Sequence, residues 1–119
     1  MINRREKGKR YERHVAGLFR AEGFDARRGQ QYCGIEGDDV VGVPGIHIEC
    51  KHNERLNIFD AIAQSERDAK DDELPVVFFT KNYCDDIVAM RADRFMVLYH
   101  AFYEEFIREK QDDRSTDYV

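Results

Sequence analysis

The sequence predicts an α/β domain with a central mixed sheet flanked by helices. Three observations support this fold class. A stretch near the N-terminus has apolar residues at helical spacing, two strand-like runs follow around a Pro-Gly turn, and the second half alternates helical and strand-like patterns. The chain has 119 residues, the length of one domain, so a single domain over residues 1–119 is expected.

The first element is expected to be a helix. Apolar residues recur at helical spacing from Tyr11 to Phe19, and Gly23 would end the helix as a left-handed cap. Residues 24–28 then alternate like a first strand. Residues 29–37 are polar and contain glycine, which is typical of a loop.

Residues 37–51 predict the centre of the sheet: a strand, a tight Pro-Gly turn and a second strand. Side chains two residues apart on a strand share a face, so His47, Glu49 and Lys51 should project together. A carboxylate and an ammonium group are thus held side by side on a rigid element. The alternate residues should point into the core: Ile46, Ile48 and Cys50.

The length of the turn decides which aspartate joins this face. A two-residue turn brings Asp38 opposite Lys51, whereas a three-residue turn brings the next aspartate, Asp39, opposite Glu49. The longer turn is favoured because proline followed by a left-handed glycine suits a three-residue bulged loop. It also brings two carboxylates together as a site for a hard divalent cation. Asp39 is therefore preferred over Asp38.

The second half of the chain predicts a helix, two strands and a last helix. Asn57 is a good N-cap for a helix that runs to about Lys70. Residues 76–80 form a continuous apolar run that fits a strand covered on both faces, and residues 87–91 form a short last strand. The helix stripe that is expected to be buried consists of Ile58, Phe59, Ile62, Ala63 and Ala69.

An aromatic stripe marks the last helix, residues 95–106. One interpretation is that the whole stripe packs against the sheet as core. The other is that its far half, Phe102, Tyr103 and Phe106, extends past the core and is buried against a second copy of the chain. Residues 111–119 are charged and are predicted to fray as a tail.

The charge is unevenly distributed. The formal net charge is −5 at pH 7, but residues 1–28 carry nine basic and four acidic side chains, a net of +5, so the remainder carries −10. This segment, with a basic arm at about residues 1–7, can bind phosphate locally because salt screens distant charges. A solvated basic helix face is the alternative. The residues expected to contact phosphate groups are Arg4, Arg5, Lys7, Lys9, Arg10, Arg28 and Lys81.

Several function classes are disfavoured. The three cysteines lack CxxC spacing and the four histidines are not paired with them, so neither a disulfide framework nor a zinc site is predicted. His47 and His52 are interpreted as surface imidazoles near a polar site. No stretch approaches the length of a membrane span, so a soluble protein of the cytoplasm is expected.

The segments Asp39-Val40-Val41 and Ile48-Glu49-Cys50-Lys51 resemble the core of the PD-(D/E)XK nuclease superfamily. Gly8-Lys9-Arg10-Tyr11-Glu12-Arg13 resembles the helix that opens its Holliday junction resolvase branch, and the closest likeness is to small resolvase-like proteins of bacteriophages. The resemblance covers roughly residues 7–99 as elements in order. Two departures are Asp38, where proline is typical, and Gln30-Gln31-Tyr32-Cys33, where archaeal resolvases carry a serine.

The resemblance implies a restriction-endonuclease-like fold and hydrolysis of phosphodiester bonds in DNA, above all in four-way junctions. It implies Mg²⁺ as cofactor, with Mn²⁺ as substitute, and a homodimer in the cytoplasm of a bacterial host. Lys51 would orient the attacking water or stabilise charge in the transition state. Catalytic residues carried over from the family are Glu12, Asp39, Glu49, Lys51 and Gln64. Metal positions are Glu12, Asp39, Glu49 and Cys50.

Two alternatives remain at this point. One is a nuclease of other DNA specificity, for restriction, repair or end trimming, which would use the same catalytic residues. The other is a non-catalytic DNA-binding protein that keeps the nuclease fold. Gln64 fits an ordinary polar helix residue equally well, and Glu12 is either a residue at the edge of the apolar stripe or a carboxylate aimed at the sheet.

Overall fold

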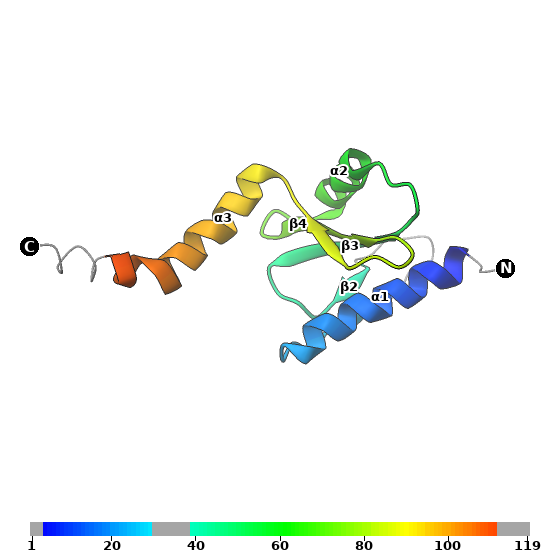
Figure 1. Cartoon of the computed structure of the whole chain (residues 1–119), viewed down its shortest axis with the longest axis horizontal. Helices are drawn as coiled ribbons and strands as arrows, with labels where there is room; N and C mark the ends of the chain where they lie inside the picture. The colour runs from blue at the N-terminus through cyan, green and yellow to red at the C-terminus, as the bar shows by residue number, and fades with distance from the viewer. Residues whose placement is uncertain (1–3, 30–38, 112–119) are drawn as a thin grey trace, which may run out of the picture.

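The computed structural model describes residues 4–29 and 39–111 (Figure 1). Five strands form one mixed sheet in the order β1-β2-β3-β4-β5, with helix α1 (Arg4–Ala21) on one face and helix α2 (Ile58–Asp68) on the other. The predicted fold class, an α/β domain with a mixed sheet flanked by helices, is confirmed. We call α1, α2 and the sheet the body of the molecule.

Helix α1 ends as the sequence predicts, at a left-handed glycine. Gly23 has a φ of 95°, its N–H donates to the carbonyl of Arg20 at 3.0 Å, and the Phe24 N–H donates to the carbonyl of Phe19 at 3.2 Å. The Phe19 and Phe24 rings add the apolar contact that accompanies this cap, with centroids 6.4 Å apart. At its other end α1 already includes residues 4–7, so this part of the predicted basic arm is helical.

Strands β1 (Arg27–Arg28), β2 (Val40–Val41) and β3 (Ile46–His52) pair antiparallel. Val40 lies opposite Ile48, so Asp39 falls opposite Glu49, and Gly45 has a φ of 81°. The three-residue turn predicted from the sequence is therefore confirmed. Strand β1 is shorter than the predicted residues 24–28 because the Phe24 N–H is used in the cap of α1.

Helix α2 is the crossover between two parallel strands, β3 and β4 (Leu74–Thr80), which pair over their whole length. Asn57 caps α2 as predicted, since its side chain accepts from the Asp60 N–H at 3.2 Å. Strand β5 (Ile87–Ala89) pairs antiparallel only with Val77 to Phe79. The start of β4 is therefore an edge position, which explains why Pro75, expected to precede the strand, is part of it.

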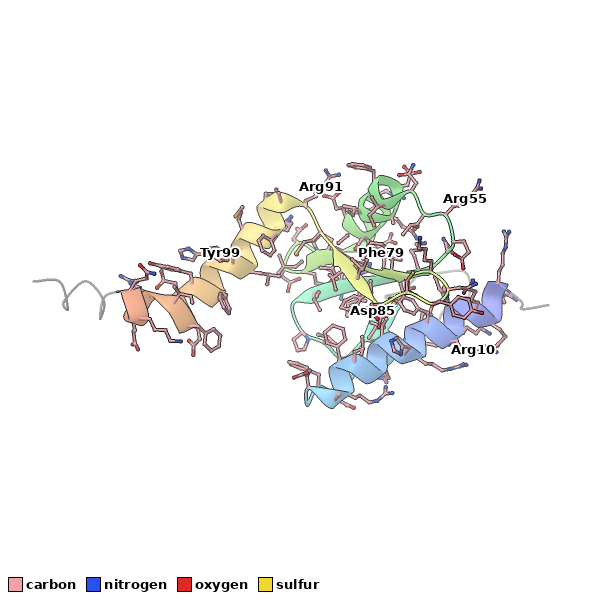
Figure 2. All side chains as sticks on the ribbon, viewed as in Figure 1. Arg10, Arg55, Phe79, Asp85, Arg91 and Tyr99 are labelled. Atoms are coloured by element: carbon pink, nitrogen blue, oxygen red, sulfur yellow. The ribbon has the colours of Figure 1, made fainter. Side chains whose placement is uncertain are left out.

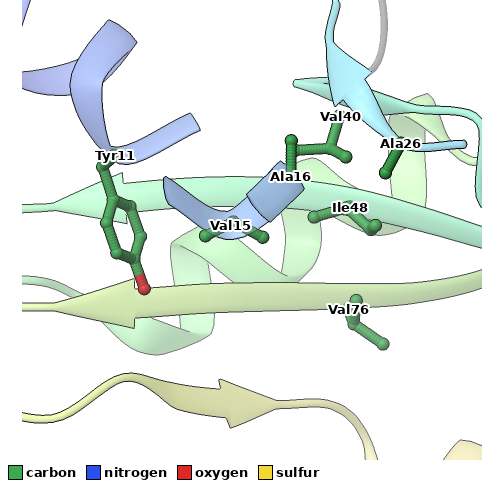
Figure 3. Packing of buried hydrophobic residues seen from close by; sticks show 7 residues of the cluster. All are labelled: Tyr11, Val15, Ala16, Ala26, Val40, Ile48 and Val76. Atoms are coloured by element: carbon green, nitrogen blue, oxygen red, sulfur yellow. The ribbon is translucent and has the colours of Figure 1, made fainter. Parts of the chain in front are cut away.

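The core on the α1 face of the sheet is apolar. Figure 3 shows its side chains, which come from α1, the segment before β1, and strands β2, β3 and β4. Burial of these residues is the main stabilising contribution in the body. The cluster consists of Tyr11, Val15, Ala16, Ala26, Val40, Ile48 and Val76.

The buried stripe predicted for α2 is wrong. The fully buried residues of α2 are Ala61 and Ser65, and Phe59 is 77% exposed. Ser65 donates its hydroxyl to the carbonyl of Val76 at 3.0 Å. Two small side chains bring the helix close to the sheet, so the larger apolar residues are turned to its flanks.

Helix α3 (Ala92–Phe102) and the π-helical turn η1 (Tyr103–Ile107) lead away from the body, and the chain stays helical to Gln111 (Figures 1 and 2). We call residues 92–111 the arm. None of the α3 residues is buried, so the interpretation that the stripe packs against the sheet as core is wrong. Gln111 is helical, and the rest of the predicted tail lies outside the described residues. No described helix is long and apolar enough to cross a membrane.

Candidate active site

The register of β2 against β3 brings two carboxylates together. The Asp39 N–H donates to the carbonyl of Ile48 at 3.3 Å, and Asp39 Oδ2 accepts from the Cys50 N–H at 2.7 Å. Glu49, directly opposite, is only 3% exposed. Asp39 is thus fixed through both its backbone and its side chain, beside a second acid on a central strand.

The pKa values of these two acids are shifted in opposite directions. Burial, followed by the negative charge of Glu49, raises the pKa of Asp39 to about 7. Burial also opposes ionisation of Glu49, but the hydrogen bond and charge of His47, the charge of Lys51 and the hydrogen bond with Asp39 outweigh it and lower the pKa of Glu49. Near neutral pH the pair therefore holds a proton between two crowded oxygens, which is a place that a cation can take.

His47 is not the surface imidazole that the sequence predicts. It is completely buried, and its Nε2 lies 2.9 Å from Oε1 of Glu49. The reason is that β3 is central and α2 covers its polar face. His52, at the end of β3, is partly exposed and lies 3.1 Å from Asn82 Oδ1 through its Nε2. His47 therefore fixes one oxygen of Glu49 and leaves the other for Asp39 or a ligand.

His47 also belongs to a group that the sequence did not predict. One ligand atom each from His47, Glu49 and Asp68 lie within 4.8 Å of one another, close enough to hold a metal ion. Imidazole nitrogen suits transition metals, whereas Mg²⁺ prefers oxygen ligands. An ion here would also replace the bond between His47 and Glu49. The group is therefore a second possible metal position, and it shares Glu49 with the carboxylate pair.

Lys51 and Gln64 are joined by a hydrogen bond. The Lys51 ammonium donates to Oε1 of Gln64 at 3.0 Å, which joins β3 to α2. Both residues line a cavity of about 490 Å³ together with Arg55 and Arg67. The amide oxygen of Gln64 thus holds the Lys51 ammonium at one place next to the carboxylate pair.

Glu12 reaches the site from α1. It lines a cavity of about 180 Å³ with Asp39, and its Oε2 accepts from Nε of Arg28 at 2.7 Å. Burial raises the pKa of Glu12, although the charge of Arg28 opposes this shift. Glu12 is therefore aimed at the sheet. Arg28, one of the residues predicted to contact phosphate, lines the same cavity and forms an ion pair with Glu12.

Cys50 behaves as the small core residue that the sequence predicts, since it packs partly buried against the apolar cluster. Burial and the surrounding carboxylates, led by Asp39, raise the pKa of its thiol. The sulfur is a neutral thiol at physiological pH and a poor ligand for a hard cation. Any contribution of Cys50 to a Mg²⁺ site would have to come from its backbone.

The basic residues gather where β3 and β4 end, around three cavities. Figure 2 shows Arg10 and Arg55 at this end of the body, far from the arm. Arg55 and Arg67 were not predicted. Arg55 follows the Glu-x-Lys strand closely, which was a usable signal, whereas Arg67 lies in the last turn of α2. Arg4, Arg5, Lys9 and Arg28 line the cavity of Asp39; Lys7, Arg10 and Lys81 line a cavity of about 710 Å³; Arg55 and Arg67 line the cavity of Lys51.

Comparison of the chain with protein families, curated proteins and solved structures finds no match. The class of protein is therefore defined by the fold and the site alone. It is an α/β domain with a five-stranded mixed sheet. A carboxylate pair, with Glu49 buried and Asp39 partly buried, lies at the end of the sheet where basic residues gather.

Proposed function

We propose that the protein is a Mg²⁺-dependent endonuclease that hydrolyses phosphodiester bonds in DNA, in the restriction-endonuclease-like manner. The observation that carries this proposal is the carboxylate pair of Asp39 and Glu49 with Lys51 next on the same strand. A carboxylate pair holds a divalent cation, a fixed ammonium stabilises a phosphate that gains charge, and both are needed in metal-assisted phosphodiester hydrolysis.

The residues fit Mg²⁺. Asp39 and Glu49 offer oxygen ligands that crowd each other, and burial together with the charge of Glu49 raises the pKa of Asp39. They would hold the ion, and Glu12 lines the same opening. When bound, Mg²⁺ supplies polarisation of the scissile phosphate and a more acidic water. Mn²⁺, which also takes oxygen ligands, is the expected substitute.

The other residues of the site would hold the catalytic groups in position and stabilise the charge of the phosphate. His47 fixes one oxygen of Glu49, so the carboxylate does not rotate away from Asp39. Gln64 fixes the ammonium of Lys51, which would stabilise the charge that develops on the transferred phosphate. The cations around the site would hold neighbouring phosphates, although the chain as a whole carries a net charge of −5.

The proposed working unit is a homodimer formed through the arm. Phe95, Tyr99, Phe102 and Phe106 form a continuous aromatic row, with neighbouring ring centroids 6.4, 6.4 and 5.3 Å apart. A helix that is apolar and covered by nothing is marginal in water. A two-fold axis would cover each row with its twin and place two sites for the two equivalent phosphates of a four-way junction. We therefore propose branched DNA as the substrate, met in the cytoplasm of a bacterial host.

The test is cleavage of a synthetic four-way junction beside a linear duplex of the same sequence, with Mg²⁺, with Mn²⁺ and with EDTA. We expect metal-dependent cleavage of the junction that Glu49→Gln abolishes. Glu22→Gln, the same change at an exposed position just beyond the C-terminal end of α1, should cleave like the wild type. Equal cleavage of both DNAs would indicate a nuclease of other specificity. Binding without cleavage under every metal would indicate a non-catalytic DNA-binding protein.

A further inference from the structure

The loop between β4 and β5 holds a tyrosine in an unusual position. Tyr83 is fully exposed and has a φ of 63°, the one positive value among the described residues other than glycine. A left-handed conformation costs an L-residue roughly 1–2 kcal/mol, so it persists only where the surrounding structure holds it. The loop therefore presents an aromatic ring to solvent at a conformational cost.

The surroundings that hold this loop are visible on both sides of Tyr83. The Cys84 N–H donates to the carbonyl of Lys81 at 3.1 Å, and the Thr80 hydroxyl lies 2.9 Å from the carbonyl oxygen of Cys84. The Asn82 N–H donates to Oε1 of Glu54 at 3.0 Å. The backbone on each side of the tyrosine is thus tied to the body, and the ring is presented at a fixed place.

Tyr83 stands at the rim of the 710 Å³ cavity, which is large enough for one nucleotide. Three cations line it: Lys7 and Arg10 from α1 and Lys81 from the end of β4. Asp85 and Asp86 also line it, and Asp86 is engaged with His14, whose Nε2 lies 2.6 Å from Oδ2. The remaining lining residues are Tyr11, His14, His52, Thr80, Asn82 and Cys84.

The cavity lies one strand away from the proposed active site. Lys51 pairs with Phe79 and His52 pairs with Thr80 in the parallel register of β3 and β4. The last residues of β4 and the loop that follows are therefore neighbours of the Glu-x-Lys strand. A DNA strand whose phosphate lies at Asp39 and Glu49 would have its neighbouring nucleotides within reach of this cavity.

We infer that this cavity takes one unstacked nucleotide of the DNA substrate, with the base on the Tyr83 ring and its phosphate at Lys7, Arg10 and Lys81. The inference rests on the proposed function. Every base has a flat face that stacks on an aromatic ring, so such a site tolerates any sequence. Unstacked nucleotides occur at branch points and single-stranded ends and not within a continuous duplex. Tyr83 thereby gives the protein a preference for branched DNA.

The experiment measures binding in EDTA, so that cleavage plays no part. A junction with 2-aminopurine at the branch point, a single strand and a linear duplex are titrated with wild type, Tyr83→Asn and Tyr83→Phe. Asparagine tolerates the left-handed conformation but cannot stack, whereas phenylalanine keeps the ring. Phe59→Ala removes another exposed aromatic, outside this cavity, and is the matched control.

We expect Tyr83→Asn to weaken binding to junction and single strand by about tenfold, within the range of one base stacked on an aromatic ring, and to leave duplex binding unchanged. Tyr83→Phe and Phe59→Ala should bind like the wild type. Only proteins with a ring at position 83 should quench the 2-aminopurine. Equal binding by Tyr83→Asn, or an equal loss for all three DNAs, overturns the inference.

Failure of the inference and failure of the proposed function give different results. A protein that cleaves DNA with Mg²⁺, but whose Tyr83→Asn variant binds the junction like the wild type, keeps the nuclease and loses the nucleotide site. A protein whose junction binding depends on the ring at position 83, but which does not cleave DNA in the presence of any metal, keeps the nucleotide site and loses the nuclease. A wild type that binds none of the three DNAs loses both.

Discussion

The body and the arm have opposite distributions of polarity. The body buries groups that prefer water, since His47 and Glu49 lie beneath α2 and Asp39 lies beside them. The arm exposes groups that avoid water, with its large apolar side chains 44–58% exposed. Buried charge and exposed apolar surface are both unfavourable unless a partner compensates them. The arm residues concerned are Phe95, Met96, Val97, Leu98, Tyr99, Phe102 and Phe106.

The proposed function assigns a different partner to each region. A divalent cation would satisfy the crowded carboxylates of the body, and a second arm would cover the aromatic row. The two regions are joined at Arg91, whose Nε lies 2.7 Å from Oε2 of Glu66 on α2. If the two partners are independent, changes in one region should leave the other unaffected. The predictions below test that separation, starting with the largest expected effect.

The largest effect is expected from Lys51→Ala. Removing the ammonium takes away stabilisation of transition-state charge, and we expect cleavage to fall by about 10³-fold or more, as for other groups of this kind. Gln64→Ala should lose less, because Lys51 keeps its charge and loses only its fixed position. Single-turnover cleavage measures both.

Both variants should still bind Mg²⁺, because neither residue is a metal position, so Mg²⁺ should still raise the melting temperature. They should also keep the oligomeric state of the wild type. Cleavage at the wild-type rate by Lys51→Ala would refute its role in the reaction.

Substitutions in the arm are expected to change the oligomeric state of the protein and not its fold. Phe102→Glu combined with Phe106→Glu places four like charges in the proposed twin interface, so we expect the protein to change from dimer to monomer. Light scattering measures this at micromolar concentration. Glu105→Gln and Lys110→Gln together alter exposed charges of the same helix outside the aromatic row and should leave the dimer intact.

The monomer should keep the far-UV signal of the body and its thermal shift with Mg²⁺. We expect it to nick junctions without paired cleavage of both strands, because coordinated cleavage requires two sites. A wild-type mass of one protomer would remove the dimer and the main reason for preferring a junction over other DNA.

Much of the carboxylate pair could be predicted from the sequence because turn chemistry is local. The Pro-Gly turn sets the register, and the register alone decides that Asp39, not Asp38, falls opposite Glu49. The caps at Gly23 and Asn57 are local in the same sense. Side-chain alternation also predicted which residues of β3 share a face with Glu49.

The burial of individual side chains and the packing of helices on the sheet could not be predicted in the same way. Alternation shows that His47 shares a face with Glu49, but burial of that face depends on where α2 crosses, which is a property of the whole fold. The stripe of α2 was misplaced because Ser65, a polar residue, is buried by a bond to the backbone of β4. The aromatic row of the arm has the spacing of a core helix, and spacing does not say which surface covers it.

The pH dependence of stability should separate the body from the arm. The pKa of Asp39 is raised from an ordinary 3.8 to about 7, so between these values the folded protein holds a proton that the unfolded chain has lost. The free energy of unfolding should therefore fall as pH rises from about 4 to about 7. Asp39→Asn keeps an acceptor for the Cys50 N–H but cannot ionise, and should be more stable than wild type at pH 8 by about 1–3 kcal/mol.

Denaturant unfolding at pH 5 and pH 8 measures this difference. Mg²⁺ should stabilise the wild type more at pH 8 than at pH 5, because at pH 5 it competes with the proton at Asp39, and should stabilise Asp39→Asn little at either pH. The arm variant Phe102→Glu/Phe106→Glu should show the pH profile of the wild type. A wild type that becomes more stable from pH 5 to pH 8 without metal would contradict the crowding of Asp39 and Glu49.

The smallest expected effect is on the salt dependence of DNA binding. It compares the loss of two cations from the body with the loss of two cations from the arm. Arg4→Gln with Lys9→Gln removes two cations beside the cavity of Asp39. Arg94→Gln with Lys110→Gln removes two from the arm, so both double variants change the net charge equally. Each lost phosphate contact lowers the slope of log K against log salt by about 0.9 for duplex DNA, so the body variant should lose about 1.8 and the arm variant none.

Anisotropy titrations in EDTA at several salt concentrations measure the slopes. Because phosphate contacts carry no base or shape readout, the body variant should weaken binding to duplex and junction alike. An equal change of slope in both variants would mean that only net charge matters, and that the basic end of the sheet is solvated surface and not the path of the DNA.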